Sequence, residues 1–285
     1  MVDTKTNAVI LSGISMVLYI TSDIITKLFL KDVNASIISL VRFFYGAPLI
    51  FFIPLIKSIN KSTLIFSTIN ILNSVVGVIS IVTGTISGFA IASQLRPVFI
   101  AVFATIFFRE RNSYSEWILF SLIFAISFLL FGNNPEIANK ANIIFIITIA
   151  MQAFTFSAFN QKNKNNPLSY MAIYNFLGFS ICLTYVLLSG LNVTELFSHY
   201  LALSINAIIA LAGSFFSILS MRTTYKLHAG SVNYLRLPIT LLAAFFLFDE
   251  NISMEVIAGS IGILYLIYKL NVLKKPTVIK VELKA

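Results

Sequence analysis

Long apolar segments dominate this chain and limit the folds that it can adopt. Of its 285 residues, 58% are hydrophobic and only 11% are charged. A helix needs about 20 apolar residues to cross a bilayer, whereas a barrel strand needs roughly ten alternating ones. Runs of the longer kind predict an all-α integral membrane protein with ten transmembrane helices. The predicted spans are residues 7–28, 37–56, 64–83, 89–108, 116–131, 141–161, 168–189, 201–221, 229–248 and 253–271.

Lysine and arginine are distributed unevenly along these spans and their connections. With the N-terminus placed inside, 14 basic residues fall in inner segments, three in outer segments and three within spans. Inner loops of membrane proteins carry such an excess. The inner residues are Lys5, Lys57, Lys61, Arg109, Arg111, Lys162, Lys164, Arg222, Lys226, Lys269, Lys274, Lys275, Lys280 and Lys284, and the outer ones are Lys27, Lys31 and Lys140. We therefore predict a multi-pass protein of the cell inner (plasma) membrane with both termini cytoplasmic. The net charge of +9 then reflects topology and not a nucleic-acid partner.

A repeat at an offset of 140 residues divides the chain into two halves. Leu95, Arg96, Ala104, Phe108 and Glu110 have identical residues 140 positions later, including Arg236 and Glu250. The offset pairs the fourth span with the ninth and the fifth with the tenth. Because each half has five spans, the second half enters the membrane inverted, as in many secondary transporters. We predict two inverted five-helix repeats, residues 1–135 and 136–285, the second ending in a short basic cytoplasmic tail.

Four charged residues lie away from the ends of the predicted spans: Asp23, Arg42, Arg96 and Arg236. An arginine at the centre of a membrane helix costs about 2.5–3.5 kcal/mol, so these side chains are expected to face the interior. One interpretation is that the arginines line a cavity and bind carboxylate or phosphate groups. The alternative is that they snorkel or pair within the fold. Asp23 either contacts a substrate amine, binds a transported proton, or forms an ion pair with Lys27 or Arg42.

Uncharged polar side chains also occur at depth in the spans, and some of these are expected to join helices without touching substrate. Gln94 and Tyr234 correspond under the offset and lie beside the two repeated arginines. Pro97 and Pro238 lie nearby and can free carbonyl groups by kinking the helices. The full set of predicted substrate-binding residues is Tyr19, Asp23, Arg42, Asn73, Gln94, Arg96, Gln152, Asn175, Tyr234 and Arg236.

Several of these segments together resemble the drug/metabolite transporter superfamily, in particular its ten-span EamA-type permeases. The segments are Val41-Arg42-Phe43, the stretch from Gln94 to Arg111, and its copy from Pro238 to Glu250. The stretch from Tyr19 to Lys27 is similar to a subgroup that includes S-adenosylmethionine carriers of intracellular bacteria. The resemblance implies two five-helix halves around a central cavity, alternating access, and transport of small organic metabolites. Arginines at positions 96 and 236 are not expected in every member of that superfamily.

The resulting functional prediction is a secondary transporter that moves a small zwitterionic or anionic metabolite across the inner membrane. S-adenosylmethionine and amino acids are the leading substrate candidates. The direction of transport, import or export, and its mode, proton coupling or exchange, stay open. An integral-membrane transferase and an exporter of another metabolite or drug are the alternatives. With one cysteine, Cys182, and two histidines in the chain, we expect no enzyme activity, no metal and no cofactor. The expected partners are the lipid bilayer and a small-molecule substrate, and the expected state is a monomer or a homodimer.

Overall fold

The computed structural model describes residues 5–52, 61–108, 113–133, 140–162, 167–191, 194–221 and 235–273, and the regular elements in these ranges are all helices. In chain order they are α1 (Lys5–Phe29), α2 (Ala35–Gly46), η1 (Ala47–Phe52), α3 (Lys61–Thr83), α4 (Ile86–Ser93), α5 (Arg96–Phe108), α6 (Tyr114–Asn133), α7 (Lys140–Lys162), α8 (Pro167–Leu188), α9 (Thr194–Ser198), α10 (Tyr200–Met221), α12 (Arg236–Phe248) and α13 (Met254–Leu273).

The composition of these helices is that of a membrane protein. In the described part of the chain, five helical segments are long and apolar enough to cross a bilayer: Val9–Phe29, Thr63–Thr83, Ile86–Phe103, Leu168–Leu188 and Tyr200–Ser220. Large apolar side chains are exposed on many helices, as at Leu129, Leu201 and Phe246. Apolar surface of this extent is typical of a face that contacts lipid. The prediction of an all-helical fold is confirmed, and the five apolar segments suggest a membrane protein. Ten spans and their inversion stay predictions.

The fourth predicted span differs from the expected continuous helix. It begins earlier, at Ile86, and is divided into α4 and α5 by a turn at Gln94 and Leu95. Pro97 has no backbone N–H, so the carbonyl of Ser93 loses the donor that a continuous helix would give it. The backbone N–H groups of Gln94 and Leu95 instead bond three residues back, at 3.0 Å each. This break places the N-terminus of α5, and with it Arg96, inside the bundle.

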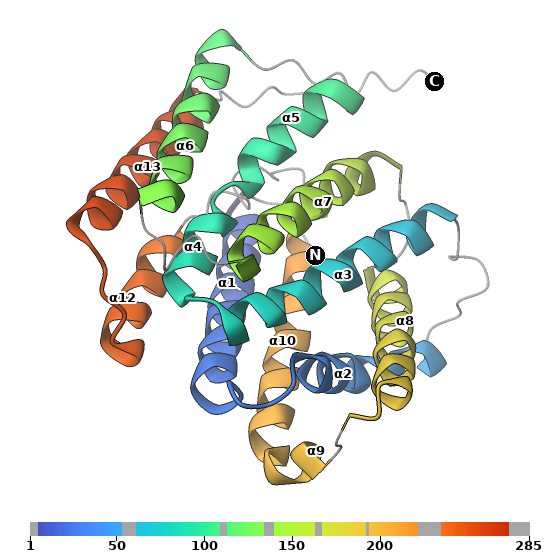
Figure 1. The fold of residues 1–285 in the computed structure, drawn as a ribbon. Helices are drawn as coiled ribbons and strands as arrows, with labels where there is room; N and C mark the ends of the chain where they lie inside the picture. The colour runs from blue at the N-terminus through green and yellow to red at the C-terminus, as the bar shows by residue number, and fades with distance from the viewer. Residues whose placement is uncertain are drawn as a thin grey trace, which may run out of the picture.

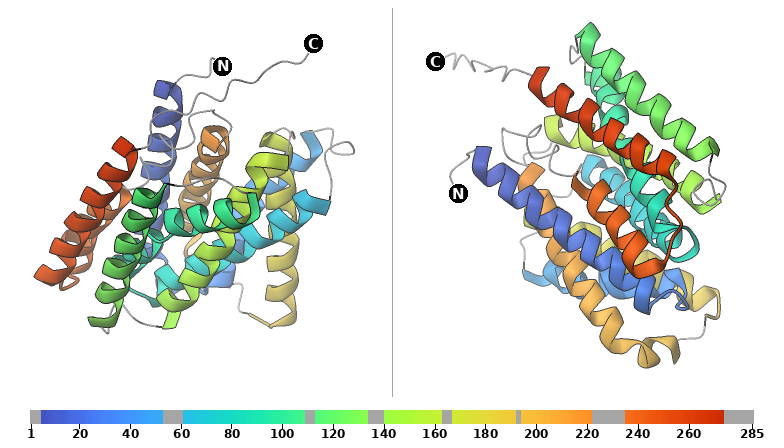
Figure 2. Two further views of the ribbon diagram at one scale, coloured as in Figure 1. Left: turned by 90° about the horizontal axis from the view of Figure 1, so that it is seen from above. Right: turned by 90° about the vertical axis from the view of Figure 1, so that its left-hand side faces the viewer.

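The helices form one bundle in which each half of the chain packs against the other. α1 lies along α10, α3 along α7, α2 along α8, and α6 along α13. Figure 1 shows the α6–α13 pair at the upper left and the α2–α8 pair at the lower right, and Figure 2 shows the same separation from two other sides. Helices α1, α3, α7 and α10 lie between these two pairs.

Two glycines allow α2 and α8 to approach closely. A Cβ atom at Gly178 would lie 2.6 Å from the ring of Phe43, and a Cβ at Gly46 would overlap the side chain of Asn175. Phe43 is buried here and meets Tyr174 edge-on, with ring centroids 5.3 Å apart. This packing fixes the direction in which both helices present their polar residues to the interior.

Candidate functional site

A cavity of about 200 Å³ lies inside the bundle, among helices from both halves of the chain. Of the ten predicted site residues, eight line it: Tyr19, Asp23, Arg42, Asn73, Arg96, Gln152, Asn175 and Arg236. Gln94 is buried but does not line the cavity, and its amide nitrogen lies 3.5 Å from the carbonyl of Ala90. That carbonyl lacks its helical donor because of the α4–α5 break. Tyr234 lies outside the described residues.

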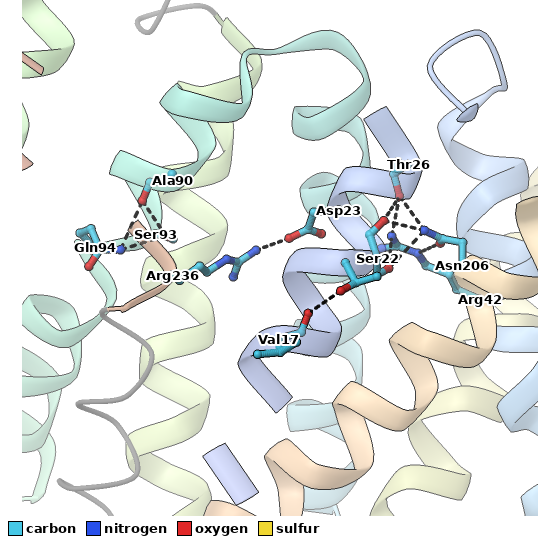
Figure 3. Close-up of polar contacts among 11 residues, drawn as sticks. Val17, Ser22, Asp23, Thr26, Arg42, Ala90, Ser93, Gln94, Asn206 and Arg236 are labelled. Carbon is cyan, nitrogen blue, oxygen red and sulfur yellow. Dashed lines mark hydrogen bonds and ion pairs between the residues drawn. The ribbon is translucent and has the colours of Figure 1, made fainter. Parts of the chain in front are cut away.

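One wall of the cavity holds an ion pair between the two halves. The guanidinium of Arg236, on α12, donates to the carboxylate of Asp23, on α1 (Figure 3). Both side chains are nearly buried, at 13% and 11% exposed. The guanidinium carbon of Arg236 also lies 4.8 Å from the ring centroid of Phe89, a cation–π contact. Asp23 thus pairs with Arg236, and the expected partners Lys27 and Arg42 bind elsewhere.

The second arginine, Arg42, is held by uncharged groups. Its Nε donates to Asn206 Oδ1 at 2.7 Å, and its Nη2 donates to Ser22 Oγ at 2.9 Å and Thr26 Oγ1 at 2.8 Å. Asn206 in turn donates to the Ser22 carbonyl at 2.7 Å. Figure 3 shows this cluster joining α1, α2 and α10. Arg42 lines the cavity, but most of its hydrogen-bonding capacity serves to hold three helices together.

The third arginine, Arg96, is the cavity cation whose charge is least compensated. Within the described residues it forms no salt bridge, and its buried Nε has no hydrogen-bond partner. It is the first residue of α5, where the positive end of the helix dipole adds to its field. A buried guanidinium without an acid favours an anion from outside the chain. Arg96 is therefore the best-placed residue to bind a carboxylate or phosphate.

The part of the cavity wall formed by α3 is uncharged. Asn70, Asn73, Ser74 and Gly77 on α3 line it, and the stripe continues to Ile81. This spacing follows one face of a helix over 12 residues, and their 11 rises of 1.5 Å span about 16 Å. Asn73 was predicted from the sequence, whereas Asn70, Ser74 and Gly77 were missed, although their three- and four-residue spacing was a signal that could have found them.

Two tyrosines of α8, Tyr170 and Tyr174, complete this wall and were also missed. Their rings are stacked, with centroids 6.2 Å apart and planes inclined by 13°. The side-chain amide of Asn70 donates to the Tyr170 hydroxyl at 2.8 Å. One turn of helix separates the two tyrosines, and this spacing was again visible in the sequence.

Two charged side chains hold the turn between α3 and α4, close to where Ile81 and Phe89 line the cavity. Lys27 Nζ donates to the Gly84 carbonyl at 2.6 Å, beyond the C-terminus of α3. Glu250 accepts from the backbone N–H groups of Ile86 at 2.8 Å and Ser87 at 3.0 Å, at the N-terminus of α4. Each charge has the sign that the helix dipole favours at that end. Glu250 was selected from the sequence because it repeats Glu110 at the offset of 140 residues. Its contact with α4 could not be predicted from the sequence. Glu110 lies outside the described residues.

Comparisons with known proteins bear on the fold. No family model matches the chain, and no curated protein sequence matches it. A solved crystal structure, described only in the words "Crystal structure of protein", is similar to it with a TM-score of 0.58 and 12% sequence identity. The similarity covers 94% of this chain and 99% of that one. At this identity the likeness concerns the arrangement of the helices along nearly the whole chain.

Proposed function

We propose that this protein is a secondary transporter that moves a small zwitterionic or anionic organic metabolite across the inner membrane by alternating access. The observation that carries the proposal is the interior cavity with three arginines and one aspartate in its wall. Since Asp23 neutralises Arg236, the cavity retains positive charge at Arg42 and Arg96. Buried charges in membrane helices mark substrate pathways, and an anionic group of the substrate would offset this excess.

The internal relation between the two halves supports alternating access. In the two halves α1 is equivalent to α7, α2 to α8, α3 to α10 and α6 to α13. If each helix is replaced by its equivalent, the α1–α10 contact becomes the α7–α3 contact, which is also present. The α2–α8 and α6–α13 contacts each join a helix to its own equivalent. The α2–α10 contact becomes the α8–α3 contact in the same way. Helices α5 and α12 each have 13 residues and start at arginines 140 positions apart. An inverted repeat predicts this pattern, and its central site can face either side.

The size of the cavity favours the smaller of the two substrate candidates. Its volume of about 200 Å³ lies below the roughly 300–1,000 Å³ of pockets for drug-sized ligands. An amino acid is well below drug size, whereas S-adenosylmethionine is close to it. We therefore place amino acids first, with the carboxylate at Arg96 and the ammonium group near Asp23.

The proposal is tested by uptake of labelled amino acids and S-adenosylmethionine into cells that express this chain. Wild-type protein should raise uptake of at least one carboxylate above that of cells with an empty vector. Arg96→Ala should lower this uptake about 100-fold or more, and Arg96→Lys should restore part of it, because lysine keeps the charge but not the two-pronged geometry. Lys140→Ala, at an exposed lysine, is the control and should behave as wild type. Uptake equal to that of empty cells for every labelled carboxylate would refute the proposal.

A further inference from the structure

The uncharged wall of the cavity contains a polar atom that the fold leaves without a partner. Asn73 lines the cavity from α3, and its side chain is 8% exposed. Within the described residues, its buried Oδ1 accepts no hydrogen bond. A buried amide oxygen in this state is costly, whereas the same oxygen bonded to a ligand is not. The cavity is therefore incomplete at Asn73.

The neighbouring amides differ from Asn73 because the fold already uses them. Asn70 Nδ2 donates to the Phe66 carbonyl and to the Tyr170 hydroxyl, at 2.8 Å each. Asn175 Nδ2 donates to the Met171 carbonyl at 2.8 Å, within its own helix. These contacts are structural and hold the wall in shape. Among the described amides of this wall, Asn73 is the one with a buried side-chain oxygen that accepts no hydrogen bond.

We infer that Asn73 determines specificity: it selects carboxylates that carry an uncharged hydrogen-bonding side group, a carboxamide or a hydroxyl. This inference rests on the proposed function and names the substrate class of the same site. The carboxylate binds at Arg96, and the side group reaches the wall of α3 and α8. Both kinds of side group donate and accept, so they satisfy the Asn73 amide in either of its two orientations. An apolar side group of the same shape leaves Asn73 Oδ1 unpaired and is rejected for that reason.

The charges of the cavity argue against a charged side group at this wall. The described lining residues with charged side chains are Asp23, Arg42, Arg96 and Arg236. Asp23 and Arg236 pair with each other, and Arg42 is held by Ser22, Thr26 and Asn206. A charged side group on the ligand would have to leave water for a wall of amides and tyrosines, without a counter-ion there.

Competition by matched pairs of amino acids tests this inference on the full-length wild-type protein. The pairs are glutamine with methionine, asparagine with leucine, and tyrosine with phenylalanine, which are similar in shape and differ in the polar group. Each is titrated against uptake of the labelled carboxylate that the wild type transports best. The polar member should compete at a concentration at least tenfold lower than its apolar partner, since the apolar partner leaves a buried acceptor unpaired.

Two variants of Asn73 provide the second readout. In Asn73→Leu, the polar and apolar members of each pair should compete at about the same concentration, or the apolar member at the lower one. Competition by the carboxylates should still be sensitive to Arg96→Ala in this background. Asn73→Asp has the same shape with a negative charge and should make lysine a better competitor than glutamine. A purely structural role for Asn73 would lower uptake without changing either ratio.

The failures of the two proposals are distinguishable. A ratio near one for all three pairs in the wild type overturns the inference about Asn73 and leaves the transporter proposal intact. An Asn73→Leu protein that is folded and keeps the wild-type ratio overturns the inference as well. If no carboxylate is taken up or competes at all, the proposed function itself fails.

Discussion

The three buried arginines show how one residue type takes different roles according to its partners. Arg236 is paired with Asp23, Arg42 is held by neutral oxygens, and Arg96 has no acid partner among the described residues. Their cost of burial is similar, and the way in which it is offset differs. In the proposed function the Arg96 charge binds the substrate, whereas Arg42 and Arg236 are held by partners within the protein. Substitutions at these positions should separate folding from transport.

The Arg42 cluster predicts a folding defect for Asn206→Leu. Asn206 is fully buried and bonds Arg42 and Ser22, so leucine leaves a buried guanidinium nitrogen without an acceptor. The free energy of unfolding should fall by about 2–3 kcal/mol. Denaturation of the purified protein in detergent measures it. Thr184→Ala is the control, because the Thr184 hydroxyl is exposed and bonds only its own helix at Ser180. Equal stability of the two variants would contradict a structural role for the cluster.

At the scale of helices, the form of the cavity wall depends on how the helices end and how closely they pack. The break between α4 and α5 brings Arg96 to the cavity, and Glu250 holds the start of α4. The Gly178 contact with Phe43 sets the distance between α2 and α8. These features predict the effects of substitutions that lie outside the cavity.

Glu250→Gln should destabilise the turn between α3 and α4. The carboxylate accepts hydrogen bonds from two backbone N–H groups and, at 2.6 Å, from the Ser87 hydroxyl. A neutral amide is attracted less strongly to the helix N-terminus, so the substitution weakens this contact. We expect a loss of about 1–2 kcal/mol, measured by denaturation in detergent, and faster labelling of a cysteine placed at Thr83. The matched control is Glu255→Gln, since Glu255 is exposed. A Glu250→Gln protein as stable as this control would contradict the contact.

Gly178→Ala should destabilise the α2–α8 contact because the new methyl group would lie 2.6 Å from the buried Phe43 ring. Overpacking of this kind costs about 1–3 kcal/mol. In Gly262→Ala the added Cβ would meet its nearest neighbour, a methyl of Ile126, at 3.7 Å, an ordinary contact, so this variant should be at least as stable as wild type. Thermal denaturation of both variants makes the comparison, and the opposite order of stability would refute this account of the packing.

At the scale of the whole molecule, the inverted repeat predicts that equivalent loops face opposite sides. Ser113 and Ser253 are 140 residues apart, are both exposed, and both accept from the first turn of the next helix, α6 and α13 respectively. Single cysteines at these positions, in a Cys182→Ala background, should react differently with a membrane-impermeant maleimide. Ser253→Cys should be labelled in intact cells and Ser113→Cys only after permeabilisation. Labelling of both from the same side would exclude the inversion.

The sequence predicted the parts of this structure that depend on apolar length and on the cost of buried charge. The helices and the interior position of Asp23, Arg42, Arg96 and Arg236 follow from those two quantities. Which charges meet depends on packing between segments: Asp23 and Arg236 are 213 residues apart. No local sequence pattern predicts a contact between residues so far apart, whereas Lys27, four residues from Asp23, was an obvious candidate for its ion-pair partner. Gln94 was selected by its position beside Arg96, but the helix break directs its amide to Ala90.

The most direct test of a carrier is counterflow in vesicles that contain the purified protein. Vesicles are loaded with unlabelled glutamine or left empty, and labelled glutamine is added outside at low concentration; S-adenosylmethionine is tested in the same way. An alternating-access carrier predicts that label accumulates transiently in the loaded vesicles, well above the empty ones, and that Arg96→Ala abolishes the accumulation. Entry of label at the same rate into loaded and empty vesicles would instead indicate a channel, and no protein-dependent entry of either solute would contradict the transporter account.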